Sequence, residues 1–372
     1  MLPPLQRPLT DDPATAYTLS SEYYLSAAIF EREKQQIFYR SWQYVAPEST
    51  LREPGDYATL RICDENVFVI RSDDGELRAF YNICRHRAHE LLKAPAGRVK
   101  NLLVCPYHAW SYDTRGELRR APMSEHREGF DNAGFCLHPV RLEVFCGFVF
   151  VNLDEDCSSL ATLAADLEQD IRAQLPDLDE LQPAPQNEQA DALIDAGWKV
   201  IVDNYVECYH CRAAHPDFAS IIDMDAYRLD VFDYWSRQLG PRIRTQNSAY
   251  PLSGTDGYAQ SAFWFLWPNT TFNLLPGPGA LNVSSIRPLG IDRCDFSGHS
   301  LIAGDRPYQP RSDYINTILV PEDVDICESV QRGLKSRSYD QGAYMVDPQR
   351  SGESEIALHH FHRLVQAALS AP

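Results

Sequence analysis

The sequence predicts a two-domain α+β protein, in which a small all-β domain follows an N-terminal helix and precedes a larger mixed domain. Two observations support this prediction. The chain has 372 residues, which is long for a single hydrophobic core. The apolar pattern also changes from a period of 3.6 to a period of 2 at about residue 43, and it becomes mixed after residue 191.

Composition narrows the range of partners. The chain carries 34 basic and 52 acidic residues, a net charge of -18, which argues against binding to nucleic acid or to an anionic membrane. Residues 1–17 contain no apolar segment of the secretory type, and the longest apolar run, Val144 to Leu153, is too short to span a bilayer. We therefore expect a soluble, cytoplasmic protein.

The first part of the chain predicts one helix followed by strands. Ser26 is placed to cap a helix that runs to Phe38. A β-hairpin is expected at residues 56–71, with its turn around Asp64 and Glu65. Further strand-like segments follow at residues 77–81, 102–104, 109–112 and 144–152.

The second part begins after a helical stretch at residues 158–175 and a proline-rich linker at 176–189. Helices are predicted at residues 198–210 and 321–337, and strands at 262–267 and 280–288. The chain is thus divided into an N-terminal helical part (1–42), a β domain (43–155) and a second domain (156–372).

The β domain contains a metal-like cluster, Cys84-Arg-His86 and Cys105-Pro-Tyr-His108, with 18 residues between its halves. Two cysteines and two histidines could hold a tetrahedral zinc ion. The same inventory also suits a Rieske [2Fe–2S] cluster, in which two cysteines bind one iron and two histidines the other. The short Cys-x-His spacing favours the iron–sulfur cluster over zinc, whose motifs more often pair Cys-x-x-Cys.

A second metal-like stretch lies at residues 203–215 and offers Glu207, His210 and His215. Residues five apart on an ideal helix point roughly 140° away from each other. A helix that unwinds between the histidines would aim both at one metal, with a third ligand from elsewhere, as in the two-histidine, one-carboxylate triad of non-haem Fe(II) oxygenases. The alternative is an ordinary packed or solvated histidine pair.

Together the two stretches resemble the terminal-oxygenase α-subunits of the Rieske non-haem iron oxygenases. The segments CRHRAHELL and CPYHAWSYDTRGEL are similar to the pattern C-x-H-R-G…C-P-Y-H-G-W, except that Ala88 and Ala109 replace glycine. The resemblance implies an α+β fold, an all-β Rieske domain inserted in a helix-grip catalytic domain with an antiparallel sheet. By the match, Cys84 and Cys105 bind one iron of the cluster and His86 and His108 the other.

The resemblance also implies the mononuclear iron ligands. His210 and His215 match the family's histidines, and Asp323 matches the acid of its remote Glu-Asp motif within residues 321–331. Asp325 lies about 200° away on a helix, so only one of the two can serve. Glu207 is expected to be the inter-subunit electron bridge, which implies a homotrimer or a dimer of trimers.

Glutamate at position 207, where most ring-hydroxylating members have aspartate, resembles the branch that acts on carnitine, glycine betaine, stachydrine and related quaternary ammonium compounds. We expect a monooxygenase component that uses O2, and NAD(P)H electrons delivered by a flavin/iron–sulfur reductase, to hydroxylate a carbon next to nitrogen and so break a C–N bond. Because aromatic faces bind cations, Phe263, Phe265 and Trp267 are the candidate pocket residues. A substrate carboxylate would need an arginine or backbone N–H groups.

Two alternatives remain at this point: an aromatic ring-hydroxylating dioxygenase α-subunit, and a zinc- or iron–sulfur-containing binding or electron-transfer protein. Two further groups are left out of the predicted site. Cys208 and Cys211 are expected to pack as small apolar side chains, and the histidines at 359, 360 and 362 to form a surface or subunit contact.

Overall fold

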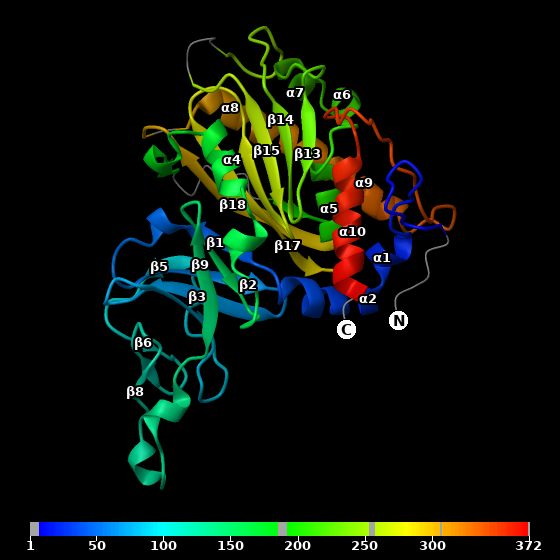
Figure 1. Cartoon of the computed structure of the whole chain (residues 1–372). Helices are drawn as coiled ribbons and strands as arrows, with labels where there is room; N and C mark the ends of the chain where they lie inside the picture. Colours follow the sequence, from blue (N-terminus) through cyan, green and yellow to red (C-terminus); the bar gives the residue numbers. More distant parts are fainter. Residues whose placement is uncertain (1–6, 185–191, 253–256, 306, 371–372) are drawn as a thin grey trace. The chain divides into compact units, whose positions relative to one another are not determined.

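The computed structural model describes residues 7–184, 192–252, 257–305 and 307–370. Its contacts divide the chain into two compact units, one formed by residues 39–160 and the other by residues 1–38 together with 161–372. The first unit is therefore inserted in the sequence of the second (Figure 1). The predicted fold class, an all-β domain inserted in an α+β domain with an antiparallel sheet, is confirmed.

The inserted unit is built on a seven-stranded antiparallel sheet with the order β1-β10-β9-β4-β3-β2-β5. The predicted hairpin is present, but its turn lies one residue earlier, because Ile62 pairs with Glu65. The apolar run after residue 144 forms two strands, since the chain turns at Cys146 and Gly147, both of positive φ. The strands are β1 (Gln43–Pro47), β2 (Asp56–Ile62), β3 (Glu65–Arg71), β4 (Leu77–Tyr81), β5 (Ala96–Arg98), β9 (Pro139–Phe145) and β10 (Phe148–Asn152).

A second, three-stranded sheet completes this unit: β6 (Leu103–Val104), β7 (Ser111–Tyr112) and β8 (Leu118–Arg120). The loop between β6 and β7 carries Cys105 and His108. Its side chains share a core with β3 and β4, in which Cys84, Cys105 and Tyr112 are buried beside Phe68. The unit therefore presents its metal-like residues from loops fastened to a rigid sheet.

The larger unit contains, within its described residues, an eight-stranded antiparallel sheet. Its order is β11-β18-β17-β16-β15-β14-β13, and β12 pairs with β18 beside β11. The strands are β11 (Gln182–Pro183), β12 (Ala192–Ile194), β13 (Arg228–Val231), β14 (Trp235–Gly240), β15 (Ser261–Leu266), β16 (Thr270–Leu274), β17 (Ala280–Gly290) and β18 (Arg293–Ile302).

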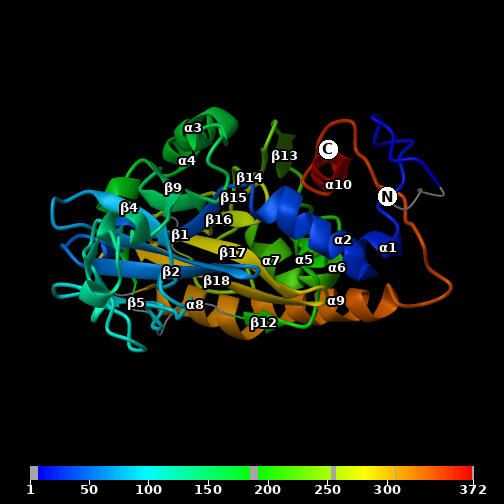
Figure 2. The same ribbon diagram turned by 90° about the horizontal axis from the view of Figure 1, so that it is seen from below.

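Helices of the larger unit pack against this sheet. A continuous helical segment runs from residue 309 to 333 and contains a π-helical stretch, Ile315–Leu319, between α8 and α9; Figure 2 shows it in orange. π-Helical turns occur frequently at functional sites. The helices are α1 (Ser21–Leu25), α2 (Ala27–Glu33), α3 (Leu160–Leu163), α4 (Leu167–Gln174), α5 (Trp198–Tyr205), α6 (Cys211–Ala214), α7 (Pro216–Ile221), α8 (Gln309–Tyr314), α9 (Val320–Gly333) and α10 (Ile356–Ser370).

Candidate metal centres and active site

The two cysteine–histidine loops of the inserted unit, residues 84–89 and 105–110, have the same backbone construction. In each loop the N–H of the cysteine donates to the carbonyl five residues later, at 2.8 Å in both cases. The N–H four residues after the cysteine donates back to the cysteine carbonyl, at 3.0 Å in both cases. Two copies of one tight loop thus project their cysteine and histidine side chains toward a common point.

Both loops place an alanine in the left-handed region of backbone space. Ala88 has φ 53° and Ala109 has φ 57°. This conformation costs a residue with a Cβ atom about 1–2 kcal/mol and costs glycine almost nothing. The glycines of the family pattern are thereby explained, and the two alanines of this chain introduce local strain without touching a predicted ligand.

The side chains of these loops fit a Rieske cluster. Cys84 and Cys105 are buried, and the rings of His86 and His108 lie 4.6 Å apart between centroids. The Nδ1 atom of His108 is buried without a hydrogen-bond partner among the described residues, whereas its Nε2 lies 2.7 Å from Nη2 of Arg87. Burial, with the nearby charge of Arg87, lowers the pKa of His108 and favours the neutral imidazole that binds metals. An inward-facing, unpaired imidazole nitrogen beside two buried thiols is a donor set for a metal cluster.

In the larger unit the helical stretch that contains His210 and His215 is interrupted twice, after α5 and between α6 and α7. The predicted helix over residues 198–210 is wrong at its end, because α5 stops at Tyr205. His210 stands just before the short helix α6, and His215 lies between α6 and α7, where Pro216 begins the next helix. These breaks allow the two imidazoles to converge, with ring centroids 5.1 Å apart.

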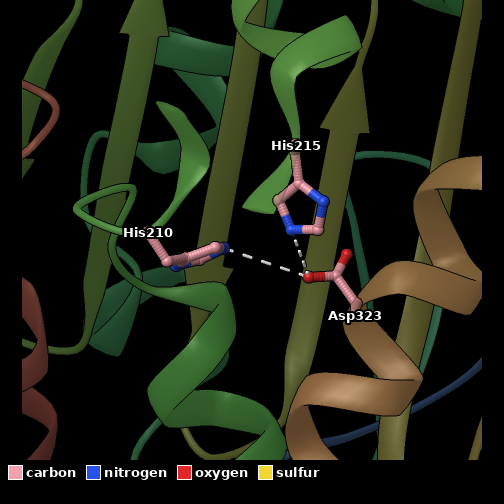
Figure 3. A group of neighbouring side chains, drawn as sticks. All are labelled: His210, His215 and Asp323. Atoms are coloured by element: carbon pink, nitrogen blue, oxygen red, sulfur yellow. Dashed lines mark hydrogen bonds and ion pairs between the residues drawn. The ribbon is translucent and has the colours of Figure 1, made fainter. Parts of the chain in front are cut away.

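Asp323, from the first turn of α9, joins the two histidines (Figure 3). Its Oδ1 atom lies 2.9 Å from Nε2 of His215 and 4.0 Å from Nε2 of His210. The three ligating atoms all lie within 4.8 Å of one another. Because metal–nitrogen and metal–oxygen bonds are about 2.0–2.2 Å long, one ion between them could contact all three after small movements.

A glutamate carboxylate contacts Nδ1 of each histidine, the ring nitrogen that does not face Asp323. Glu207 lies 2.6 Å from Nδ1 of His210 through Oε1, and its Oε2 accepts from the backbone N–H of Tyr209. Glu322 lies 2.7 Å from Nδ1 of His215. Such contacts fix the tautomer and orientation of metal-binding histidines. The sequence analysis did not predict this role for Glu322, whose only indication in the sequence is its position next to Asp323.

The electrostatics of His215 agree with a cation site. Its side chain is only 2% exposed. Burial by itself lowers the pKa of His215, but the hydrogen bonds and negative charges of Asp323 and Glu322 outweigh that effect and raise the pKa above its usual value. The same negative surroundings would favour a divalent metal ion.

The rest of the Glu-Asp motif anchors α9 to the start of α5. Glu328 accepts from the backbone N–H of Asp195 at 3.2 Å, and Gln331 accepts from that of Gly197 at 2.8 Å. These contacts fix α9, which carries Asp323, against the helix that leads to His210. Asp325 is exposed and lies outside the group of converging ligand atoms.

The histidine–aspartate group opens into a cavity between the sheet and the segment 309–333. Aliphatic side chains form a larger share of its lining, and five phenylalanines and tyrosines stand among them: Tyr205, Phe218, Tyr227, Phe263 and Phe296. Of the three predicted pocket residues, the structure places Phe263 in this lining. Phe265 and Trp267 lie outside the lining and pack against Phe361 of α10, since the cavity occupies only one end of that sheet face.

Two groups of residues outside the predicted site differ from expectation. Cys208 and Cys211, which bracket His210, are buried in an apolar core as expected, but they form a disulfide in the structure. His359 and His362 are buried and do not form a surface contact. His362 contacts Asp203 at 3.0 Å and Tyr344 at 2.6 Å, which places it in the support of α5.

Comparison with known families agrees with this geometry. Residues 41–138 match the Rieske [2Fe-2S] domain, and residues 178–371 match the ring hydroxylating alpha subunit (catalytic domain). The chain belongs to the Rieske ring-hydroxylating α-subunit family. The resemblance stated from the motifs is thus confirmed, and this protein is an oxidoreductase of the Rieske oxygenase class, whose domains hold a [2Fe–2S] cluster and a catalytic iron.

Related Rieske oxygenases cover nearly the whole chain. The carnitine monooxygenase oxygenase subunit of Acinetobacter pittii is 37% identical over 358 residues, 95% of each chain. That of Escherichia coli strain K12 is 36% identical and covers 95% of this chain and 94% of its own. Choline monooxygenase of Spinacia oleracea is 29% identical over 96% of this chain and 79% of its own.

Solved structures extend the comparison. The quaternary ammonium Rieske monooxygenase CntA in complex with L-carnitine has a TM-score of 0.86 at 35% identity, covering 96% of this chain and 97% of that one. A naphthalene 1,2-dioxygenase has a TM-score of 0.80 at 19% identity, covering 98% and 95%, which shows the shared fold alone. Within the described part of this Rieske oxygenase, no helix is both long and apolar enough to cross a bilayer.

Proposed function

We propose that this protein is the oxygenase component of a two-component monooxygenase that hydroxylates a carbon next to nitrogen in a small quaternary ammonium compound. The observation that carries the proposal is the convergence of His210, His215 and Asp323 in the wall of a cavity whose lining includes five phenylalanine and tyrosine rings. Aromatic faces attract a cation that cannot donate hydrogen bonds. The similarity to carnitine monooxygenase oxygenase subunits and to choline monooxygenase supports the same substrate class.

The ligand assignment follows from the donor sets. Cys84, Cys105, His86 and His108 would hold the [2Fe–2S] cluster, and His210, His215 and Asp323 the mononuclear iron. When bound, the cluster supplies single electrons and the mononuclear iron supplies the site of O2 activation. The protein's part is to hold each imidazole with Nε2 facing the iron in the larger unit, which Glu207 and Glu322 do from the other ring nitrogen.

We assign Glu207 a second role, that of electron bridge. Its side chain is 10% exposed and reaches His210 directly. In the proposed assembly, a homotrimer or a dimer of trimers, this carboxylate would also accept a hydrogen bond from His108 of the partner subunit, which links the two centres. A structure of CntA described as giving insight into inter-subunit electron transfer supports this arrangement. NAD(P)H electrons would arrive through a separate flavin/iron–sulfur reductase.

The substrate chemistry follows from where oxygen is inserted. A hydroxyl group on a carbon attached to nitrogen gives a hemiaminal, in which the C–N bond breaks as the hydroxyl proton leaves and a carbonyl forms. Attack on a methyl group releases formaldehyde and a demethylated amine. Attack on the backbone carbon next to nitrogen of carnitine releases trimethylamine.

Oxygen consumption tests the proposal. The purified oxygenase, with a reductase and NADH supplied, is given carnitine, glycine betaine, stachydrine, choline and benzoate in separate assays. We expect at least one quaternary ammonium compound to stimulate oxygen uptake, together with release of formaldehyde or trimethylamine. Stimulation by benzoate alone would overturn the substrate class and favour an aromatic ring dioxygenase.

A further inference from the structure

One charged side chain in the cavity has no role in the site described so far. Arg311, in α8, lines the cavity and is 5% exposed. Among the described residues that line it, Arg311 is the only lysine or arginine, and the acids are Glu207 and Asp323, both beside the histidines. Among the described lining residues, the negative charges thus lie beside the predicted metal ligands and the positive charge is that of Arg311.

The guanidinium of Arg311 is only partly satisfied. Its Nη1 donates to the carbonyl of Pro278 at 2.7 Å and lies 3.4 Å and 3.5 Å from those of Leu275 and Pro276. Within the described parts of the chain, no carboxylate pairs with Arg311, and no acceptor contacts its Nε or Nη2. A buried cation without a counter-ion is costly, and burial lowers the pKa of Arg311. The free edge of the guanidinium fork is suited to a carboxylate.

The position of Arg311 relative to Asp323 follows from the helical segment that carries both. Arg311 and Asp323 lie on the continuous helical segment 309–333, twelve residues apart. At about 1.5 Å per residue their Cα atoms are roughly 18 Å apart, so a ligand held by Arg311 would extend along the cavity wall toward Asp323. Ser312, Asn316 and Leu319 line the cavity along the segment between them.

We propose that Arg311 binds the carboxylate of a zwitterionic quaternary ammonium substrate, and so selects betaine-type compounds over choline. The inference rests on the proposed function. In this arrangement the guanidinium holds the anionic end, while the aromatic lining holds the ammonium group with a C–H bond facing the metal ligands. An uncharged group at the far end leaves the arginine unpaired and binds more weakly.

The competing role for Arg311 is structural, since it also fastens the loop at residues 275–278. Binding measured by calorimetry on the anaerobic holoenzyme separates the two roles. Carnitine and glycine betaine are each compared with their amides, in which a neutral group of the same shape replaces the carboxylate. For at least one pair, the wild type is expected to bind the acid about 10- to 100-fold more tightly than the amide.

Arg311→Met is expected to remove that preference, with affinity for the acid falling about 10- to 100-fold and affinity for the amide changing less than about threefold. Arg311→Lys should retain part of the preference for the acid over the amide. Arg237→Met, which removes a partly buried arginine paired with Asp170 and Asp230, is the control and should leave the preference intact.

Equal binding of acid and amide by the wild type would overturn the role of Arg311, a result that needs no variant to fold. Equal losses for both ligands in Arg311→Met would do the same and leave a structural role. Either result leaves the proposed function standing if these compounds stimulate oxygen uptake. If no quaternary ammonium compound binds or stimulates uptake, the proposed function fails as well.

Discussion

The two metal-binding regions of this protein are assembled in different ways. In the inserted unit, two copies of one short loop carry all four predicted ligands within residues 84–108, and each loop closes on itself with the same pair of backbone hydrogen bonds. In the larger unit, the predicted ligands come from a broken helix and from α9, and His215 and Asp323 are 108 residues apart in sequence. The first region depends on local backbone geometry, and the second on how distant helices pack.

This difference implies that the predicted ligands of the two regions are supported by different kinds of contact. The loops of the inserted unit are supported by backbone conformation, including the left-handed alanines. The larger site is supported by side chains: Glu207 and Glu322 orient the histidines, and Glu328 and Gln331 fasten α9 to the start of α5. Substitutions in one region should therefore leave the other intact.

The largest effect is expected from His210→Ala. Loss of one of three ligands should lower turnover by about a thousandfold or more, because the mononuclear iron no longer binds productively. The visible and electron paramagnetic resonance spectra of the Rieske cluster should remain. Retained turnover would contradict the role of His210 as a ligand. Loss of the Rieske spectrum would contradict the independence of the two regions.

Cys105→Ser is the reciprocal variant. It should abolish the Rieske spectrum while mononuclear iron still binds, measured as iron content after reconstitution. Loss of iron from both regions would show that the larger unit depends on the smaller one for its fold.

Glu207→Gln sharpens the role of the carboxylate that we assign to both centres. We expect electron delivery in a single turnover to slow about a hundredfold, because the charged bridge to the partner subunit is lost, with little change in substrate affinity. Stopped-flow oxidation of the reduced cluster measures this step. An unchanged rate would remove the bridging role.

Glu322→Gln tests the orientation of His215. Second-layer carboxylates typically contribute 10- to 100-fold to metal affinity, and we expect a loss of about tenfold at the low end of that range. Competition with a chelator measures the change. Asp325→Asn, an exposed position on the same helix, is the matched control and should bind iron normally; equal losses in both variants would argue against a specific role for Glu322.

The smallest effect concerns the loops of the inserted unit. Ala88→Gly and Ala109→Gly should each raise stability by about 0.5–1 kcal/mol, because relief of the left-handed strain exceeds the added entropy of glycine in the unfolded chain. Thermal unfolding of the holoprotein measures this change in stability. Ala367→Gly, in the exposed part of α10, is the control and should destabilise. Destabilisation in all three variants would contradict the account of the loops.

The sequence was most informative where the structure is local. The spacing of cysteine and histidine predicted the loops, and alternation predicted most strands of the inserted unit. Prediction from the sequence was wrong in two places. The apolar run after residue 144 is interrupted by a turn at Cys146 and Gly147, and α5 ends at Tyr205 although the next residues tolerate a helix. In both places tertiary demands override local propensity.

Asp323 was identified only through the family motif, because its approach to the histidines depends on a contact across more than a hundred residues. Glu322 and Arg311 carried no distinct signal, since an acid on a helix and an arginine near a loop are usually solvated. Phe263 and Phe265 share one face of β15 and Trp267 directly follows it, but the alternating pattern could not show that only Phe263 lines the cavity.

Metal and sulfide analysis of the purified protein tests the central claim, that two separate regions hold two different iron centres. We predict about three iron atoms and about two acid-labile sulfides per chain. In His210→Ala the iron should fall to about two with the sulfide unchanged. Zinc in place of iron, or sulfide lost together with the mononuclear iron in that variant, would contradict the account.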